Sequence, residues 1–191
     1  MLAEYQMTLS PLTDDTAEGK AGELLQNARK EMGFVPNMYA NMAHSPGLLE
    51  TYMTGYSAFR KGSGLSPQEQ ELVLLVISRD NGCEYCVAAH STLADMSGVP
   101  KDATDAIRDE STITDPKLKA LSDFTRVMVE TRGNPSSHDA LAFLDAGYSD
   151  AHILGIVLAI SVKVISNYSN HLFHTEVDDA FAGRNWDAPT S

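Results

Sequence analysis

The chain has 191 residues, enough for one hydrophobic core, with an ordinary 43% of hydrophobic and 21% of charged residues. Its formal net charge of −12 argues against binding nucleic acid or an anionic lipid surface, because no run of Lys or Arg offers a local exception. The N-terminus shows no secretory signal, and two cysteines cannot make a disulfide scaffold. We therefore expect a soluble, cytoplasmic protein in a reducing compartment.

Helical signals dominate from one end of the chain to the other, and no segment shows sustained alternation of apolar and polar residues. The sequence predicts helices over about 13–32, 36–43, 46–60, 66–81, 83–97, from 99 onward, 115–132, 136–146 and 149–173. The last dozen residues are expected to form a tail. The fold class predicted is all-α, a helical bundle in a single domain that spans 1–191, with its core at about 15–178.

Individual helix boundaries differ in how clearly they are marked. A cap at Thr13 is expected to start the first helix, and Ser66, followed by Pro67 and Glu69, is a strong helix start. The run 72–78 could be a buried strand on its β-branched content alone, but its cap and length favour a helix. The register of the last helix is expected to break near 166–167.

The most apolar stretch of the chain is 153–165. It contains Gly155, Ser161 and Lys163, and it is too short to span a bilayer, so it predicts a core helix rather than a membrane segment. It is also compatible with a subunit interface.

The segments 65–90 and 148–173 show a weak internal echo at a shift of 83 residues. Tyr85 falls on Tyr168, whereas Cys83 and Cys86 fall on Ser166 and Ser169. The echo suggests two related helix pairs, of which only the first retains the cysteines and their chemistry. Alternatively, two amphipathic helices resemble each other by composition.

The segment 71–90 carries the residues that can do chemistry. Cys83 and Cys86 are separated by two residues at a predicted helix start, where unpaired backbone N–H groups stabilise a thiolate. His90 lies four residues after Cys86, on the same helix face, and can take the thiol proton. Glu71 lies on the preceding helix, and the spacing alone does not bring it to the sulfurs.

Each of these residues also has an ordinary explanation. The two cysteines could be buried, inert thiols, or half of a zinc site that lacks a fourth ligand after His90. Glu71 could be a solvated helix charge. His171 and His174 form a second polar cluster, which we interpret as hydrogen bonding in the core or at an interface rather than as catalytic.

Together Glu71, Cys83, Cys86 and His90 resemble the active-site signature of the alkyl hydroperoxidase D-like family, within the carboxymuconolactone decarboxylase superfamily. The flanking segments 33–37 and 65–67 resemble that superfamily too, and 167–171 resembles its peroxidase-related members. The resemblance covers about 15–178. It departs at Tyr85, where well-known members carry a second histidine. Tyrosine is no base at neutral pH, so the proton relay is expected to be shorter.

The resemblance implies a peroxidase without haem, metal or other cofactor. Cys86 would attack a small hydroperoxide and become a sulfenic acid, and Cys83 would resolve it to a disulfide that an external dithiol reduces. Glu71 and His90 would relay protons. A lipoyl or thioredoxin-like protein would be the reductant, and trimers or hexamers are expected.

Three other functions stay open at this stage. The chain could exchange disulfides without acting on peroxides, it could be a lactone decarboxylase of the kind that names the superfamily, or it could be a non-redox binding or assembly protein whose thiols are inert or metal-bound. The second needs acid–base residues and no redox-active pair, so the cysteines argue against it.

Overall fold

The computed structural model describes residues 2–189, and in this part of the chain every regular element is helical. The helices are α1 (Gly19–Met32), α2 (Asn37–Met42), α3 (Pro46–Gly62), α4 (Pro67–Asp80), α5 (Glu84–Ser97), α6 (Lys101–Arg108), α7 (Pro116–Glu130), α8 (Ser137–Asp145), α9 (Asp150–Phe173) and the short 3₁₀ helix η1 (Asp179–Arg184). The all-α prediction is confirmed.

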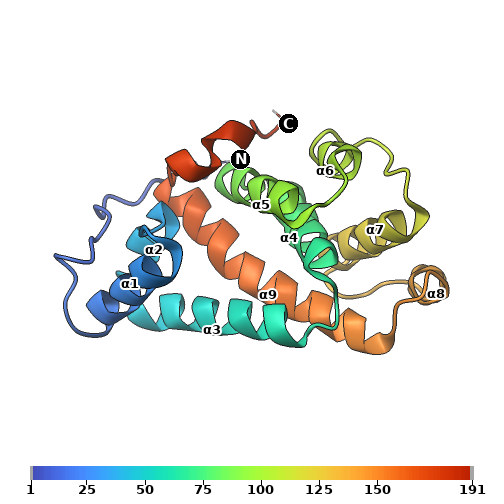
Figure 1. Ribbon diagram of the computed structural model, residues 1–191, viewed down its shortest axis with the longest axis horizontal. Coiled ribbons are helices and arrows are strands. Elements are labelled where there is room, and N and C mark those ends of the chain that lie inside the picture. The colour runs from blue at the N-terminus through green and yellow to red at the C-terminus, as the bar shows by residue number, and fades with distance from the viewer. Residues whose placement is uncertain (1, 190–191) are drawn as a thin grey trace.

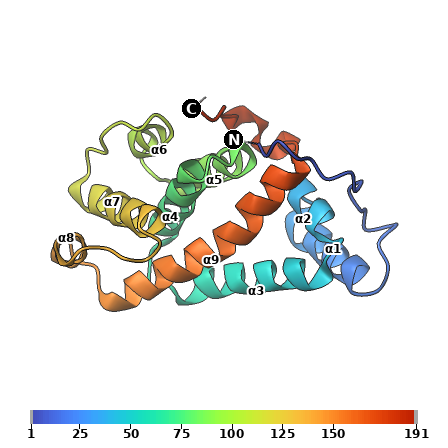
Figure 2. The same ribbon diagram turned by 180° about the vertical axis from the view of Figure 1, so that it is seen from behind.

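The long helix α9 runs diagonally through the molecule, with α3 along one side of it and the α4–α5 pair along the other (Figures 1 and 2). Two glycines let α3 and α9 approach closely. A Cβ at Gly55 would lie 2.9 Å from Cγ2 of Val162, and a Cβ at Gly155 would lie 3.2 Å from Cβ of Ser63. With α3 packed closely on one side of α9, the other side of α9 packs against α4 and α5.

Helix α4 is the centre of the core. Ser66 and Glu69 form the predicted capping box at its start, and the six residues from Leu72 to Ile77 are all fully buried. A helix buried on all sides has no polar face, which explains why this run could be mistaken for a strand. The strand alternative is wrong.

The chain turns sharply between α4 and α5, where Gly82 adopts a left-handed φ of 66° that favours glycine. The two helices therefore form a hairpin (Figure 1). Its turn fixes which residues of α4 and α5 face each other.

Two features of the helices differ from the predictions. Helix α1 begins at Gly19, because Thr13 and Thr16 bond to each other in a separate turn that uses up the expected cap. Helix α9 is uninterrupted at 166–167. Residues 148–173 therefore contain one continuous helix, with no turn that corresponds to the turn between α4 and α5, so they do not form a second helix pair. Common ancestry of this segment and 65–90 stays a prediction.

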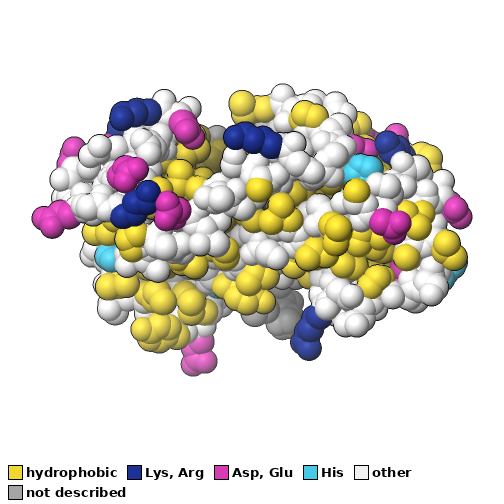
Figure 3. All heavy atoms as spheres, turned by 90° about the horizontal axis from the view of Figure 1, so that it is seen from below, with side chains coloured by type: hydrophobic (Ala, Val, Ile, Leu, Met, Phe, Trp, Pro, Cys, Tyr) yellow, Lys and Arg dark blue, Asp and Glu magenta, His cyan; other side chains and the backbone are white. Residues whose placement is uncertain are grey.

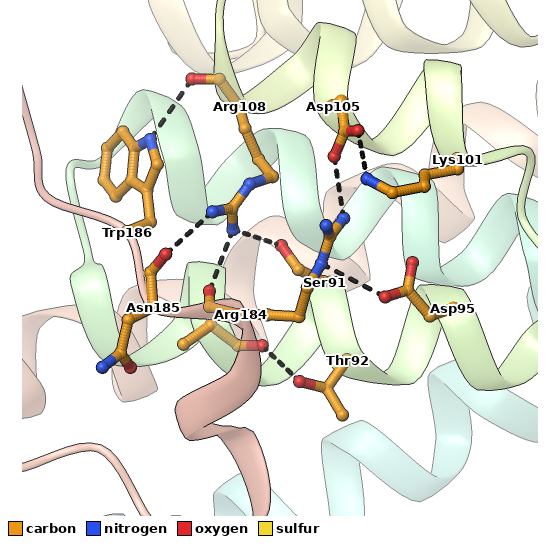
Figure 4. A network of polar contacts seen from close by, with 10 residues as sticks. Ser91, Thr92, Asp95, Lys101, Asp105, Arg108, Arg184, Asn185 and Trp186 are labelled. Atoms are coloured by element: carbon orange, nitrogen blue, oxygen red, sulfur yellow. Dashed lines mark hydrogen bonds and ion pairs between the residues drawn. The ribbon is translucent and has the colours of Figure 1, made fainter.

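The end of the chain is not a loose tail. Residues 175–189, here called the C-terminal strap, contain η1 and lie across α5 and α6 (Figure 1). Arg108 donates to the carbonyls of Arg184 (3.0 Å) and Asn185 (2.8 Å), and Nε1 of Trp186 donates to the carbonyl of Arg108 (3.2 Å; Figure 4). Arg184 also pairs with Asp95 and Asp105.

Helix α9 is long and apolar enough to cross a membrane by length and composition, with a mean hydropathy of 1.5 over its most apolar window. A core helix of a soluble protein passes the same test, and 39% of this window is buried by the rest of the chain. The exposed remainder includes Leu154, Val157 and Tyr168.

Candidate active site

The two cysteines lie at the start of α5. Cys83 occupies the N-cap position, and Cys86 lies in the first turn. Both are free thiols, and only 1% and 2% of their surfaces are exposed. The first-turn N–H groups and the positive end of the helix macrodipole favour negative charge at this point. The predicted thiolate position is therefore present, but it is buried rather than open to solvent.

The α4–α5 hairpin brings Glu71 to His90. Glu71 lies about three turns before the connection and His90 about two turns after it, so the two side chains meet across the pair. Nδ1 of His90 lies 2.9 Å from Oε2 of Glu71, and the other carboxylate oxygen pairs with Arg60. Glu71 is thus a buried ion-pair partner and not a solvated helix charge.

The carboxylate of Glu71 determines which nitrogen of His90 carries the proton. Burial alone would raise the pKa of Glu71, but the hydrogen bond with His90 and the charge of Arg60 lower it below its usual value. An ionised carboxylate only accepts hydrogen bonds, so Nδ1 of His90 donates and Nε2 is left as a proton acceptor. Burial, together with the charge of Lys163, lowers the pKa of His90 and keeps the ring neutral.

Helix α9 supplies polar groups to the two sulfurs from the opposite side. Nδ2 of Asn170 lies 3.3 Å from Sγ of Cys86 and 3.7 Å from Sγ of Cys83, and Oγ of Ser166 lies 3.9 Å from Sγ of Cys86. Lys163, one turn before Ser166 on the same helix face, is fully buried. The sulfurs therefore lie between the hairpin and α9.

The two thiols are not equivalent. Burial would raise the pKa of Cys86, but the hydrogen bond from Cys83 and the charge of Lys163 lower it well below its usual range. For Cys83, burial, the hydrogen bond to Cys86 and the negative charge of Cys86 all raise the pKa. At neutral pH the thiolate is therefore favoured on Cys86 and the protonated thiol on Cys83.

Tyr85 points away from the relay. Its hydroxyl donates to Oδ2 of Asp178 in the C-terminal strap at 2.5 Å, and its ring packs edge-on against Phe181. Burial and the charge of Asp178 raise the pKa of Tyr85, so the phenol stays protonated. Tyr85 therefore anchors the strap over α5.

The comparisons with known proteins agree with this arrangement. The family model of the "Carboxymuconolactone decarboxylase family" matches residues 46–125, which contain Glu71, Cys83, Cys86 and His90. A search of curated proteins finds no match.

Among solved structures, the alkylhydroperoxidase AhpD core of an uncharacterized peroxidase-related protein from Ralstonia eutropha JMP134 superposes with a TM-score of 0.76 at 22% identity, over 91% of this chain and 96% of that one. The chain therefore shares the fold of the alkylhydroperoxidase AhpD core, and its residues 46–125 are similar to the carboxymuconolactone decarboxylase family.

Two further structures share the fold. An uncharacterized peroxidase-related protein from Silicibacter sp. TM1040 has a TM-score of 0.74 at 20% identity, over 96% of this chain and 97% of that one. The debrominase Bmp8, in a cysteine-to-alanine variant in complex with 2,3,4-tribromopyrrole, has a TM-score of 0.75 at 15% identity, over 94% and 96%. At these identities the likeness concerns the fold alone, and the fold serves more than one chemistry.

The structure brings together all four predicted site residues, and it adds three from α9 that sequence reasoning missed: Lys163, Ser166 and Asn170. The available signal for Lys163 was a lone charge inside the most apolar stretch of the chain, which predicts either a solvent-facing position or a buried functional one. All three lie outside the segment that the family model matches.

The remaining polar candidates do not join the thiols as ligands. Within residues 2–189, no three side chains of His, Cys, Asp or Glu come together in an arrangement able to hold a metal ion. Nε2 of His174 bonds to the carbonyl of Ala3 at 2.7 Å, a structural contact. His171 is half-buried, and burial lowers its pKa.

Proposed function

We propose that the chain is a thiol-dependent peroxidase that reduces small hydroperoxides through a Cys83–Cys86 dithiol–disulfide cycle. The proposal depends on the placement of both cysteines at the start of α5, with Cys86 four residues before a histidine whose Nδ1 is held by Glu71 and whose other nitrogen can accept a proton. The lowered pKa of Cys86 and the raised pKa of Cys83 agree with it. The match of residues 46–125 to the family model supports the same class of chemistry.

The cycle has two balanced steps. The Cys86 thiolate attacks the distal oxygen of the hydroperoxide, the O–O bond breaks, and the leaving alkoxide takes a proton to become an alcohol while Cys86 becomes a sulfenic acid. The Cys83 thiol then displaces hydroxide from that sulfur, with loss of water, and the disulfide forms. His90, held by Glu71, is the group placed to accept and return the protons.

An external dithiol must return the enzyme to its reduced form. We propose a lipoyl or thioredoxin-like protein for this role, and a cytoplasmic location where such reductants are kept reduced. Both sulfurs are buried, and neither lines any of the four cavities described. Small peroxides and slender dithiols therefore suit this site better than the surface disulfide of a folded protein.

Self-association is also part of this proposal. Hydrophobic side chains gather on the face shown in Figure 3, with charged groups mostly toward its margins. Leu154 and Val157, three residues apart on α9, are 70% and 43% exposed, so they form an apolar surface that a second copy would cover. We expect a homo-oligomer, a trimer or a hexamer, whose mass light scattering after size exclusion would measure; Leu154→Glu should lower it.

The test is peroxide consumption with dithiothreitol as the reductant, on wild type, Cys86→Ser and Cys83→Ser in parallel. Wild type should turn over, Cys86→Ser should be inactive, and Cys83→Ser should react once and stop as a sulfenic acid. A wild type that cycles its disulfide but consumes no peroxide would be a disulfide oxidoreductase instead. A pair that never oxidises would overturn the redox proposal and favour inert or metal-bound thiols in a non-redox protein.

A further inference from the structure

Lys163 is a fully buried lysine with no conventional partner. None of its surface is exposed, and its Nζ makes no hydrogen bond with any atom of residues 2–189. In the same part of the chain no carboxylate lies within ion-pair distance of it. An isolated ammonium in a protein interior costs several kcal/mol or more, so a buried charge of this kind needs an anion.

The position of Lys163 on α9 identifies the anion. Ser166 and Asn170 follow it at spacings of three and seven residues, on one face of the helix, and both place polar atoms against Sγ of Cys86. The neighbouring Val162 packs in the same cluster as the two cysteines. Lys163 thus faces the sulfurs, and its positive charge lowers the pKa of Cys86.

The other titratable groups that face Cys86 cannot take the place of Lys163. They come from α3, α5 and α9: Tyr52, Tyr56, Cys83, Tyr85, His90 and His171. Burial raises the pKa of the three tyrosines and of Cys83, and it lowers the pKa of both histidines, so each of these groups is neutral at pH 7. The side chain of Lys163, by contrast, is ordinarily a cation.

We propose that Lys163 is the counter-ion of the Cys86 thiolate, and that it thereby makes the Cys83–Cys86 disulfide easier to reduce. Reduction by a dithiol gives the oxidised reductant, a Cys83 thiol, a Cys86 thiolate and one proton. The ammonium stabilises this product state and not the uncharged disulfide. A stabilised reduced form means a more oxidising disulfide, which favours release of Cys86 as the leaving thiolate when the external dithiol attacks. The inference rests on the redox pair of the proposed function but not on peroxide as its oxidant.

The experiment follows Cys86 without any turnover. In a Cys83→Ser background, the thiolate absorbance at 240 nm is titrated against pH, with Lys163 and with Lys163→Met. We expect the wild-type lysine to hold the midpoint well below the ordinary value of about 8.5 and the methionine to raise it, with at least a tenfold loss of thiolate at a pH between the two midpoints. Lys163→Arg should restore the low midpoint. Lys119→Met, on an exposed surface pair, is the matched control and should change nothing.

A second measurement uses the intact cysteine pair. Equilibration with dithiothreitol at pH 7 should show the disulfide of Lys163→Met at least tenfold harder to reduce, a fall in potential of about 30 mV. A merely structural lysine would change the melting temperature but not these two readouts. The proposal is overturned if Cys86 titrates near 8.5 with Lys163 in place, a result that needs no lysine variant to fold, or if Lys163→Met leaves both the midpoint and the equilibrium unchanged. Absence of peroxidase activity would leave both titrations unaffected.

Discussion

Replacing Glu71 by glutamine should break the relay while preserving the shape of the site. In the native protein the carboxylate accepts from Arg60 on one oxygen and from Nδ1 of His90 on the other. A glutamine offers one oxygen and one NH₂ group. Because Arg60 can only donate, it takes the oxygen, and the NH₂ group is left facing His90. Nδ1 must then accept, so the ring proton moves to Nε2 and the base toward the thiol is lost.

The expected costs follow from the burial of the pair. Removing one partner of a fully buried ion pair costs about 3–5 kcal/mol. The side chain of Arg60 is 22% exposed and so keeps some hydration, and the glutamine retains both contacts, so we expect Glu71→Gln to lower the free energy of unfolding by about 2 kcal/mol. Loss of a positioned general base should slow peroxide-driven oxidation of the thiols by about 10²–10⁴-fold.

Three measurements separate these effects. Urea denaturation gives the change in stability, stopped-flow oxidation of the thiol pair gives the rate, and ¹⁵N chemical shifts of the imidazole give the tautomer of His90. The matched control is Asp123→Asn, which removes a carboxylate from the exposed pair with Lys119 and should have little effect on any of the three.

The tautomer decides whether the reasoning is correct. If the rate falls while the proton of His90 stays on Nδ1, then Glu71 acts through something other than the orientation of His90. If the proton moves to Nε2 and the rate is unchanged, then His90 is not the base, and the general-base role assigned to it is wrong.

Three further results are expected. Gly55→Ala should lower the free energy of unfolding by about 1–3 kcal/mol in urea denaturation, because the new Cβ would lie too close to α9. The control is Gly47→Ala in the same helix, whose Cβ would meet nothing within 4 Å and which should be neutral or stabilising. Asp178→Asn should loosen the C-terminal strap, because the Tyr85 hydroxyl loses a charged acceptor, by about 1–2 kcal/mol, and hydrogen exchange should rise in 175–189 before the core. The pKa of His90 is lowered in the folded state, so below about pH 6.5 the unfolded chain binds more protons than the folded one. The contribution of neutral His90 to the free energy of unfolding is therefore full above that pH and is lost as the pH falls. His90→Gln should reduce the difference in stability between pH 7 and pH 5, measured by denaturation.

Much of the fold could be predicted because its helix boundaries are local. The capping box at Ser66 and the glycine turn at Gly82 depend only on neighbouring residues, and both are where the sequence placed them. The start of α1 was missed because Thr13 bonds to Thr16 in a turn of its own, a competition between two local structures that the residue types do not decide. The strap was missed because its contacts with α5 and α6 join residues more than 70 positions apart.

The site could be predicted on one side and not on the other. Glu71, Cys83, Cys86 and His90 lie on two consecutive helices, so short spacings carry their relationship. The contribution of α9 depends on how that helix rotates against the hairpin, which no spacing between residues 86 and 163 encodes. A buried lysine and an exposed one look alike in the sequence until the packing of α3 against α9 is known.

The two charged residues flanking the thiol should have opposite effects, and this distinguishes their roles. The negative charge of Glu71 works against a nearby thiolate, so Glu71→Gln should leave Cys86 at least as ionised at neutral pH as in the wild type while removing the proton acceptor. The positive charge of Lys163 favours the thiolate, so Lys163→Met should lower ionisation while His90 keeps its hydrogen bond to Glu71. On the proposed mechanism, ionisation and proton transfer are therefore separable in this site: the ammonium on α9 would stabilise the thiolate, and the Glu71–His90 pair of the α4–α5 hairpin would move the proton.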